Sequence, residues 1–264
     1  MCCFFHSDFA FAAFEGKVKE PLIEPQGDVI LITQGLKLSD RTEKVTFYDQ
    51  SFLGEGCAFN KQAAPIYGAT GGFMLGKDPI ICGGFSPESK VQTDCKLAFG
   101  LDPDPIGLIE PRAFAASLVK KASELWITGG INSHFTPLKS TELLDATNKI
   151  ISKGPELPIP LQLHCLVKLN DDQVVFIGGK TTNGTVNSTF LYDFTNAQWI
   201  RGPDLQVPRF GQFCTLIQTH LGFLILVVGG KNRHEKTLMT MEWLRLDHDH
   251  EWKSGEICNF SISI

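Results

Sequence analysis

The run from Asp247 to Glu251, Asp-His-Asp-His-Glu, combines two alternating histidines with three carboxylates. Imidazole nitrogens and carboxylate oxygens are the ligands that zinc and related divalent ions take in proteins. Alternate residues of an exposed turn seldom converge on one ion, however, and this run lies where a turn between two short strands is expected. We therefore predict a turn here, with no metal ion and no cofactor for the chain.

Eight cysteines are a second source of chemistry, because thiols ligate metals or pair as disulfides. Their spacing with histidine matches no zinc site. Cys82 and Cys95 fall on two consecutive expected strands, so their side chains could meet across a sheet. A Cys82–Cys95 disulfide and a pair of buried free thiols stay open as equal alternatives. Cys165 and Cys214 occupy matching places in two similar segments, and we predict that they are buried thiols.

Three Asn-x-Ser/Thr triplets, the acceptor pattern for N-linked glycans, occur at Asn183, Asn187 and Asn259. The Asn183-Gly184 pair is equally explained as a hairpin turn, and such triplets are common by chance. Taken with the Cys82–Cys95 alternative, the triplets favour an extracellular protein over a cytoplasmic one.

Composition and motifs exclude several function classes. The net charge of −5 over 264 residues comes without the basic stripe that nucleic-acid binding needs. The longest apolar run, residues 221–228, is too short to span a membrane. No phosphate-binding glycine loop or nucleophile elbow is present. We therefore expect neither nucleic acid nor a membrane as a partner, and predict that the chain is not an enzyme.

The candidate residues described above lie within a repeated pattern of short strands. A short apolar run closed by glycine recurs five times, and the closing glycines Gly35, Gly84, Gly130, Gly179 and Gly230 are 49, 46, 49 and 51 residues apart. We call the five segments repeats 1 to 5. Repeats 2 to 5 close with a pair of glycines, namely Gly83-Gly84, Gly129-Gly130, Gly178-Gly179 and Gly229-Gly230. Further short apolar runs flank each closing strand, which predicts four antiparallel strands per repeat.

Sheets of this size cannot bury both faces alone, so successive repeats must stack around an axis. We expect one propeller domain over residues 28–264. Residues 1–27 would then form a leader or a partial strand, with a candidate strand at 6–14 that pairs with another repeat.

The pattern resembles the kelch repeats of β-propeller proteins over residues 28–258. In the kelch pattern a diglycine strand is followed by a strand that ends in an aromatic or aliphatic residue and Asp, then by Trp. Repeat 4 supplies Tyr192-Asp193 and Trp199, and repeat 5 supplies Leu246-Asp247 and Trp252. Repeats 1 to 3 lack that Trp. The resemblance implies an all-β, kelch-type propeller of five recognisable blades, either a degenerate six-bladed ring or a fragment of one.

The kelch resemblance also implies a functional face, formed by the loops after the diglycines and the loops that link the blades. At the ends of the linking loops the sequence places Tyr67, Arg112, His164 and Arg209. After the diglycines it places Phe85 and Ser86, then Asn132, Ser133 and His134, then Lys180 and Thr181, then Lys231, Asn232 and Arg233.

This face is cationic although the chain is acidic. Arginine presents a rigid fork of donors that suits carboxylates. The first interpretation is that the face binds a protein or peptide segment that carries acidic residues. The equal alternative is that Arg112 and Arg209 are structural and hold neighbouring blades through backbone carbonyls.

Two function classes follow from the resemblance. The preferred one is a non-catalytic interaction module, because kelch propellers often bind proteins. A variant of it is a substrate receptor of a cullin-type ubiquitin ligase, although residues 1–27 cannot hold the BTB domain that usually precedes such a propeller. The other class is a carbohydrate-binding or sugar-isomerising propeller similar to the mutarotases. A copper site like that of galactose oxidase is not supported, because the chain contains only Tyr48, Tyr67 and Tyr192.

Overall fold

The computed structural model describes residues 11–16, 29–34, 45–48, 68–72, 80–86, 88–97, 106–121 and 124–256, the first three of these ranges by their backbone alone. Every regular element among them is a β-strand, which confirms the all-β prediction. Over these ranges the chain forms no helix capable of crossing a membrane.

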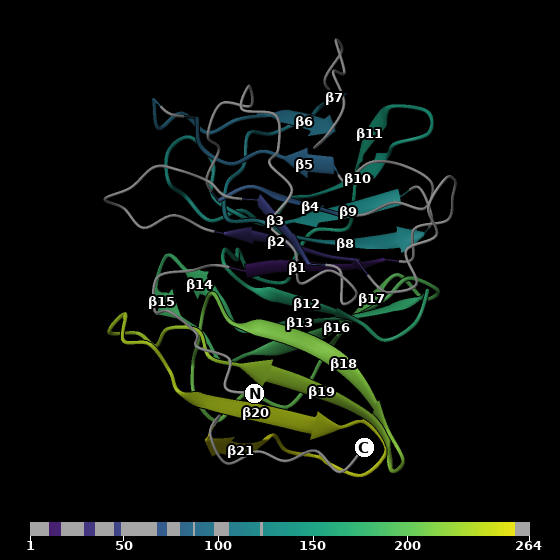
Figure 1. The fold of residues 1–264 in the computed structure, drawn as a ribbon, viewed down its shortest axis with the longest axis vertical. Coiled ribbons are helices and arrows are strands. Elements are labelled where there is room, and N and C mark those ends of the chain that lie inside the picture. Colours follow the sequence, from purple (N-terminus) through teal and green to yellow (C-terminus); the bar gives the residue numbers. More distant parts are fainter. Residues whose placement is uncertain are drawn as a thin grey trace. The chain divides into compact units, whose positions relative to one another are not determined.

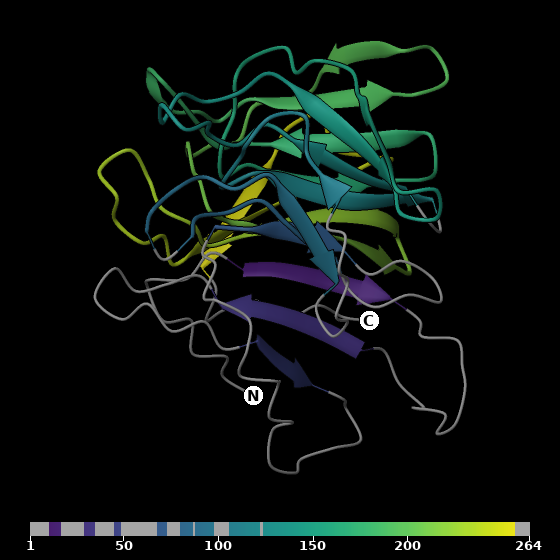
Figure 2. The same ribbon diagram turned by 90° about the horizontal axis from the view of Figure 1, so that it is seen from above.

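Repeat 1 forms a three-stranded antiparallel sheet in the order β1-β2-β3. Its strands are β1 (Phe11–Gly16), β2 (Val29–Gln34) and β3 (Val45–Tyr48), which Figure 2 shows as adjacent purple to blue arrows. The pairing of β1 with β2 runs from Phe11 opposite Gln34 to Gly16 opposite Val29. The N-terminal strand thus lies later than the expected 6–14, and it belongs to the sheet of repeat 1 itself.

Repeats 2 to 5 each form a sheet of four antiparallel strands that lie side by side in sequence order (Figure 1). Repeat 2 contains β4 (Thr70–Gly72), β5 (Ile80–Cys82), β6 (Asp94–Leu97) and β7 (Ile106–Gly107). Repeat 3 contains β8 (Ala116–Lys121), β9 (Glu124–Thr128), β10 (Thr141–Asp145) and β11 (Ile150–Lys153). Repeat 4 contains β12 (Cys165–Lys168), β13 (Gln173–Ile177), β16 (Thr189–Asp193) and β17 (Gln198–Arg201), with the hairpin β14 (Lys180–Thr181) and β15 (Gly184–Thr185) after its diglycine. Repeat 5 contains β18 (Phe213–Thr219), β19 (Gly222–Val228), β20 (Thr240–Arg245) and β21 (Lys253–Glu256).

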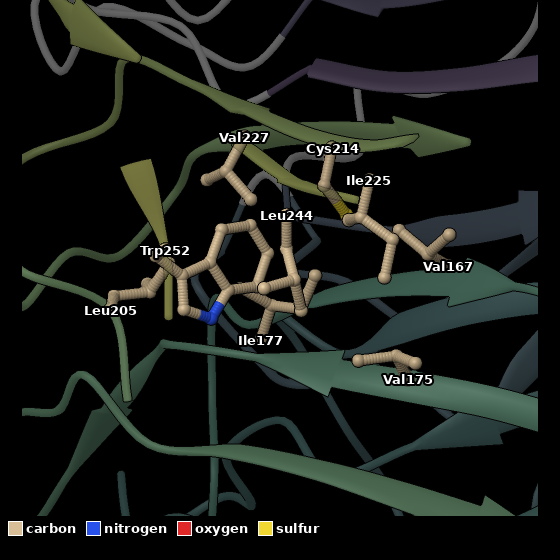
Figure 3. Packing of buried hydrophobic residues seen from close by; sticks show 9 residues of the cluster. All are labelled: Val167, Val175, Ile177, Leu205, Cys214, Ile225, Val227, Leu244 and Trp252. Carbon is tan, nitrogen blue, oxygen red and sulfur yellow. The ribbon is translucent and has the colours of Figure 1, made fainter. Parts of the chain in front are cut away.

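The described residues divide into two compact units. Those up to Leu157 carry repeats 1 to 3, and those from Pro158 carry repeats 4 and 5. Each unit has its own apolar core. In the second unit the core joins repeat 4 to repeat 5: Trp252 packs near Ile177, Val227 and Leu244, with Cys214 at its edge (Figure 3). In the first unit a matching cluster joins repeats 2 and 3 and includes Ile80, Leu108, Leu125 and Leu144.

The diglycine that closes each central strand lets the next linking loop approach the sheet. Gly178 and Gly179 both have positive φ, at 58° and 107°. A Cβ on Gly178 would lie 2.6 Å from the carbonyl oxygen of Arg209, and one on Gly179 would lie 2.8 Å from the Cβ of His164. The Gly179 amide donates to the Arg209 carbonyl oxygen at 2.8 Å, so the glycine pair fastens the loop that leads into repeat 5.

Four cysteines form two disulfides, one within a sheet and one between sheets. Cys82 and Cys95 face each other on β5 and β6, which confirms the disulfide alternative for this pair. Cys165 on β12 and Cys214 on β18 are also joined, so the prediction that they are free thiols is wrong. The first strands of neighbouring repeats lie side by side, and this brings the two sulfur atoms together.

The counterpart of the Cys165–Cys214 bond in the first unit is a hydrogen bond. Cys165 lies opposite Ile177, the residue before Gly178, and Thr70 lies opposite Cys82, the residue before Gly83. The two therefore occupy the same position in repeats 4 and 2. The hydroxyls of Thr70 and Ser117 are 2.6 Å apart, between the first strands of repeats 2 and 3. One position thus links adjacent repeats covalently in one unit and by a hydrogen bond in the other.

Candidate functional site

Arg112 and Arg209 end the loops that lead into repeats 3 and 5, and both side chains are completely buried. Each guanidinium donates to the carbonyl oxygen of the first glycine of its own repeat, Gly129 at 2.8 Å and Gly229 at 2.9 Å. Each also binds a buried carboxylate on the third strand of that repeat. The Arg112–Glu142 distance is 2.5 Å and the Arg209–Glu242 distance is 2.7 Å.

The carboxylates complete the arrangement by accepting hydrogen bonds from the linking loops. Glu142 accepts from the amides of Ile109 and Glu110, and Glu242 accepts from those of Gln206 and Val207. Burial lowers the pKa of Arg209 from its ordinary value, and Glu242 opposes that shift by stabilising the cation. The arginines are therefore structural, and the interpretation that they contact a partner is corrected by their burial.

His164 is also buried, which removes it from the candidate partner-binding residues. Its ring stacks on Phe176 with centroids 5.7 Å apart, and burial lowers the pKa of His164 to about 3. In repeat 4 the residue equivalent to Arg112 and Arg209 is Leu161, not His164. The amide of Gln162 donates to the Lys180 carbonyl oxygen just as the amide of Phe210 donates to that of Lys231, so Leu161 and Arg209 precede equivalent residues. His164 corresponds instead to Gln212, which contacts the second glycine of its repeat in the same way.

The loops after the diglycines of repeats 3 and 5 have the same construction. In each, an asparagine side chain accepts two backbone hydrogen bonds: Asn132 from His134 and Thr136, and Asn232 from His234 and Lys236. Ser86 accepts one such bond, from Lys90, in repeat 2. These predicted site residues shape their own loops, as expected for short polar side chains in turns. They thereby hold the neighbouring side chains, including the exposed His134 and His234, toward solvent.

Repeats 4 and 5 bring their diglycine loops together through an ion pair. The ammonium of Lys180 lies 3.0 Å from the carboxylate of Glu235 and 5.0 Å from the ring centre of Phe210. The hydrogen bond from Lys180 holds the pKa of Glu235 below its usual value, so this carboxylate is ionised at neutral pH. In the same loop the Arg233 Nε donates to His234 Nε2 at 3.1 Å. A neutral His234 therefore carries its proton on Nδ1.

Repeats 2 and 3 make the equivalent contact with aromatic rings. Phe85 holds the position of Lys180, Phe135 holds the position of Glu235, and their ring centroids are 6.0 Å apart. Phe85 is buried, whereas 64% of Phe135 is exposed. Both contacts join the first residue after one diglycine to the fifth residue after the next. Only the pair in repeats 4 and 5 carries charge.

The exposed candidates are therefore confined to the diglycine loops. Ser133, His134 and Arg233 are exposed, and Lys180, Thr181 and Lys231 are partly buried. Tyr67 lies outside the described residues. The sequence reasoning missed His234, Glu235 and Lys236, which the structure places in the same loop as Arg233. These residues could have been found by comparing segments 131–136 and 231–236, which have Asn and His at the same positions.

The acidic and histidine run after β20 lies in the turn before β21, as predicted from the sequence. Asp249 accepts a hydrogen bond from the Arg245 amide and pairs with Lys253 at 2.8 Å. The hydrogen bond from Lys253 is the main cause that lowers the pKa of Asp249. This carboxylate thus has a structural role in closing the β20–β21 hairpin.

Comparison with known proteins gives a likeness of fold. No family model matches the chain, and no curated protein sequence matches it. One of the solved structures that match is entitled "Structure of YjhT". It is 15% identical, with a TM-score of 0.66 over 93% of this chain and 84% of that chain. At that identity the likeness shows the fold alone, and the kelch assignment and a protein or peptide ligand stay predictions.

The comparison corrects the prediction that this chain is not an enzyme. YjhT is a sialic acid mutarotase, which is an enzyme, so this fold gives no ground for the prediction that the chain is not an enzyme. The chain is an all-β protein with a propeller-like fold of four-stranded antiparallel sheets.

Proposed function

We propose that the protein binds an acidic sugar at the diglycine loops of repeats 4 and 5 and interconverts its anomers. The candidate site consists of Lys180, Lys231, Arg233, His234, Glu235 and Lys236, which we call the cationic loop pair. The observation that carries the proposal is the set of charged and titratable side chains in these loops. Within these two neighbouring loops lie four cations, an ionised carboxylate bound to one of them, and a histidine whose Nε2 accepts from Arg233.

Recognition of the sugar rests on the surplus of positive charge. Of the four cations, Lys180 is paired with Glu235, while Arg233 and Lys236 are exposed. A sugar carboxylate would bind the free donors of Arg233, whose Nη groups are not used by the contact between its Nε and His234. A neutral sugar lacks that interaction. The proposal therefore predicts a preference for acidic sugars over neutral ones.

Interconversion of anomers needs proton transfers and the reversible opening of the sugar ring. A base removes the proton of the anomeric hydroxyl, an acid donates a proton to the ring oxygen, and the bond between the anomeric carbon and the ring oxygen breaks. Reversal of these steps on the other face of the carbonyl closes the ring as the second anomer. In this scheme the ionised Glu235 accepts the proton of the anomeric hydroxyl, and the neighbouring His234 donates the proton to the ring oxygen. No cofactor enters this reaction.

The experiment measures the rate of anomer exchange by NMR, with the spontaneous rate in buffer subtracted. The probes are N-acetylneuraminic acid and glucuronic acid, with glucose as the neutral control. The wild-type protein should accelerate exchange of an acidic probe more than that of glucose. His234→Gln and Glu235→Gln should each lower the catalysed rate about 100-fold or more, since one acid or base group contributes at least that much.

The matched control is His134→Gln, because His134 occupies the same place in the loop of repeat 3 but has Ser133 in place of Arg233. This variant should keep the wild-type rate. Two results contradict the proposal: a wild-type rate equal to that of buffer for every probe, or full activity in both the His234 and the Glu235 variants. Unchanged melting temperatures show that the variants are folded.

A further inference from the structure

Two of the three glycan-acceptor triplets lie in repeat 4, only a few residues apart, yet the structure places them in different environments. Asn183 starts the triplet Asn183-Gly184-Thr185, and Asn187 starts Asn187-Ser188-Thr189. The third, at Asn259, lies outside the described residues. An N-linked glycan is bulky and hydrophilic, so a folded protein accommodates it only where the asparagine amide faces solvent.

Asn183 meets this requirement. It lies in the two-residue turn between β14 and β15, where Thr181 pairs with Gly184. The backbone of the turn is held by Thr181, whose hydroxyl donates to the Gly184 carbonyl oxygen at 3.1 Å and accepts from the Asn183 amide at 3.1 Å. The side chain of Asn183 is exposed, and the hydrogen bonds of the described residues do not use its terminal amide.

Asn187 does not meet it. Its side-chain Nδ2, the atom to which a glycan attaches, donates to the Leu205 carbonyl oxygen at 3.0 Å. The backbone continues the same contact, because the Leu205 amide donates to the Asn187 carbonyl oxygen at 2.8 Å. The rest of the triplet is also inside the protein: Ser188 is 8% exposed, Thr189 is 2% exposed, and the Thr189 hydroxyl donates to the Pro203 carbonyl oxygen at 2.7 Å.

The disulfides are an independent indication of the compartment. Disulfides form and persist in oxidising environments, which include the secretory pathway in which N-linked glycans are added. Both cysteine pairs are joined inside sheets or cores rather than at exposed ends, since Cys82, Cys95 and Cys214 are buried. These bonds agree with maturation in the secretory pathway, where an accessible acceptor would be modified.

We propose that Asn183 carries an N-linked glycan and that Asn187 stays unmodified. The glycan extends from the tip of the β14–β15 hairpin, whose first residue is Lys180. Because Gly184 has nothing within 4 Å of the space that a Cβ would fill, the hairpin leaves room on that side for the attached sugar.

The test is site-resolved mass spectrometry of the full chain, produced through the secretory pathway of cultured eukaryotic cells. Enzymatic removal of N-glycans in heavy-oxygen water labels each asparagine that carried one. Asn183 should be labelled in most molecules and Asn187 in few. Thr185→Ala, which keeps Asn183 but destroys its triplet, should abolish the label at Asn183. Asn187→Gln should leave the occupancy of Asn183 unchanged.

An unlabelled Asn183 in secreted wild-type protein overturns the proposal, and so does a label on Asn187 as frequent as that on Asn183. Loss of secretion in the Asn187 variant would not affect the comparison within the wild-type protein, which measures both residues in one sample. The readout is a mass and does not depend on sugar turnover, so this inference and the proposed function fail separately.

Discussion

Arg209 and Glu242 form an ion pair with a 2.7 Å separation, and neither side chain has any exposed surface. Arg112 and Glu142 repeat it in the other unit. In repeat 4 the corresponding positions hold Leu161 and Phe190. The loop that leads into repeat 4 also has Pro158, which lacks an amide hydrogen, at the position from which Ile109 and Gln206 donate to the carboxylates. Three changes thus occur together: the cation and the anion are replaced by apolar residues, and one amide donor is absent.

Loss of one partner of this pair should be severe. Arg209→Ala leaves the Glu242 carboxylate buried without its cation, which should lower the free energy of unfolding by about 3–5 kcal/mol. Arg201→Ala is the matched control, because Arg201 also pairs with a carboxylate, Asp204, but is 58% exposed. It should cost less than about 1 kcal/mol. Urea unfolding followed by tryptophan fluorescence measures both, and equal losses would contradict the assigned role.

Replacement of both partners should be milder. The double variant Arg209→Leu/Glu242→Phe copies the residues of repeat 4, so no buried charge remains. It should be more stable than Arg209→Ala, because apolar replacement of a buried ion pair is often neutral or better. The same unfolding experiment decides this. A double variant as unstable as the single one would show that the hydrogen bonds to the linking loop dominate.

His164 predicts a pH dependence. Its pKa is about 3 in the folded protein because the ring is buried, whereas an unfolded histidine has a pKa near 6.5. Below pH 6.5 the unfolded chain binds a proton that the folded chain does not, so the stability falls as the pH falls toward 3. The slope is about 1.4 kcal/mol per pH unit for this one group. His164→Gln, which introduces the residue of the equivalent position in repeat 5, should remove that contribution from unfolding curves measured between pH 6.5 and 4.5.

The disulfide between β12 and β18 should contribute measurably to stability. The double variant Cys165→Thr/Cys214→Ser copies the hydrogen-bonded pair Thr70 and Ser117. It should lower the free energy of unfolding by about 2–4 kcal/mol, because the bond closes a separation of 49 residues. Addition of a reductant should destabilise the wild-type protein more than this variant, which keeps Cys82–Cys95 but lacks the bond between β12 and β18. Equal effects of the reductant on both would contradict the prediction.

The second glycine of a closing pair should resist substitution. Gly179→Ala places a Cβ 2.8 Å from that of His164 at a φ of 107°, so it should be destabilising by more than about 2 kcal/mol. Gly107→Ala is the control, because its Cβ would meet nothing within 4 Å and its backbone is not left-handed. It should change the stability by less than about 0.5 kcal/mol. Thermal unfolding compares the two.

The strand pattern could be predicted from the sequence because each central strand is a short apolar run with a glycine pair at its end. The pairing of Cys82 with Cys95 followed from the same pattern, since the two residues fall on consecutive strands. The functional residues were harder to predict from the sequence. The sequence places Arg112 and Arg209 at loop ends, but their side chains turn inward because Glu142 and Glu242 lie on the third strands.

Small offsets in the alignment of the first strands and linking loops explain the other differences. The sequence predicts that Cys165 and Cys214 are equivalent, but Cys165 corresponds to Phe213. This one-residue offset lets the two cysteines face each other across neighbouring first strands. His164 lies three residues after Leu161, the true equivalent of the arginines, although both end the same linking loop. Alignment on Gly178 and Gly229 alone does not give these relationships, because β18 and β19 are longer than β12 and β13. The pairing of Cys165 with Ile177 and of Phe213 with Val228 across the first hairpins gives them.

The contacts between neighbouring repeats are specific to the two repeats that form them. Phe85 meets Phe135 and Thr70 meets Ser117, whereas Lys180 meets Glu235 and Cys165 meets Cys214. Exchange of repeat 3 with repeat 5 would set Lys180 against a phenylalanine, Phe85 against a carboxylate, and each cysteine against a hydroxyl. The junction of repeats 2 and 3 and that of repeats 4 and 5 therefore each suit one neighbour and not the other. Within each unit, repeats with the same strand pattern are thus made distinct by the side chains at their shared junction.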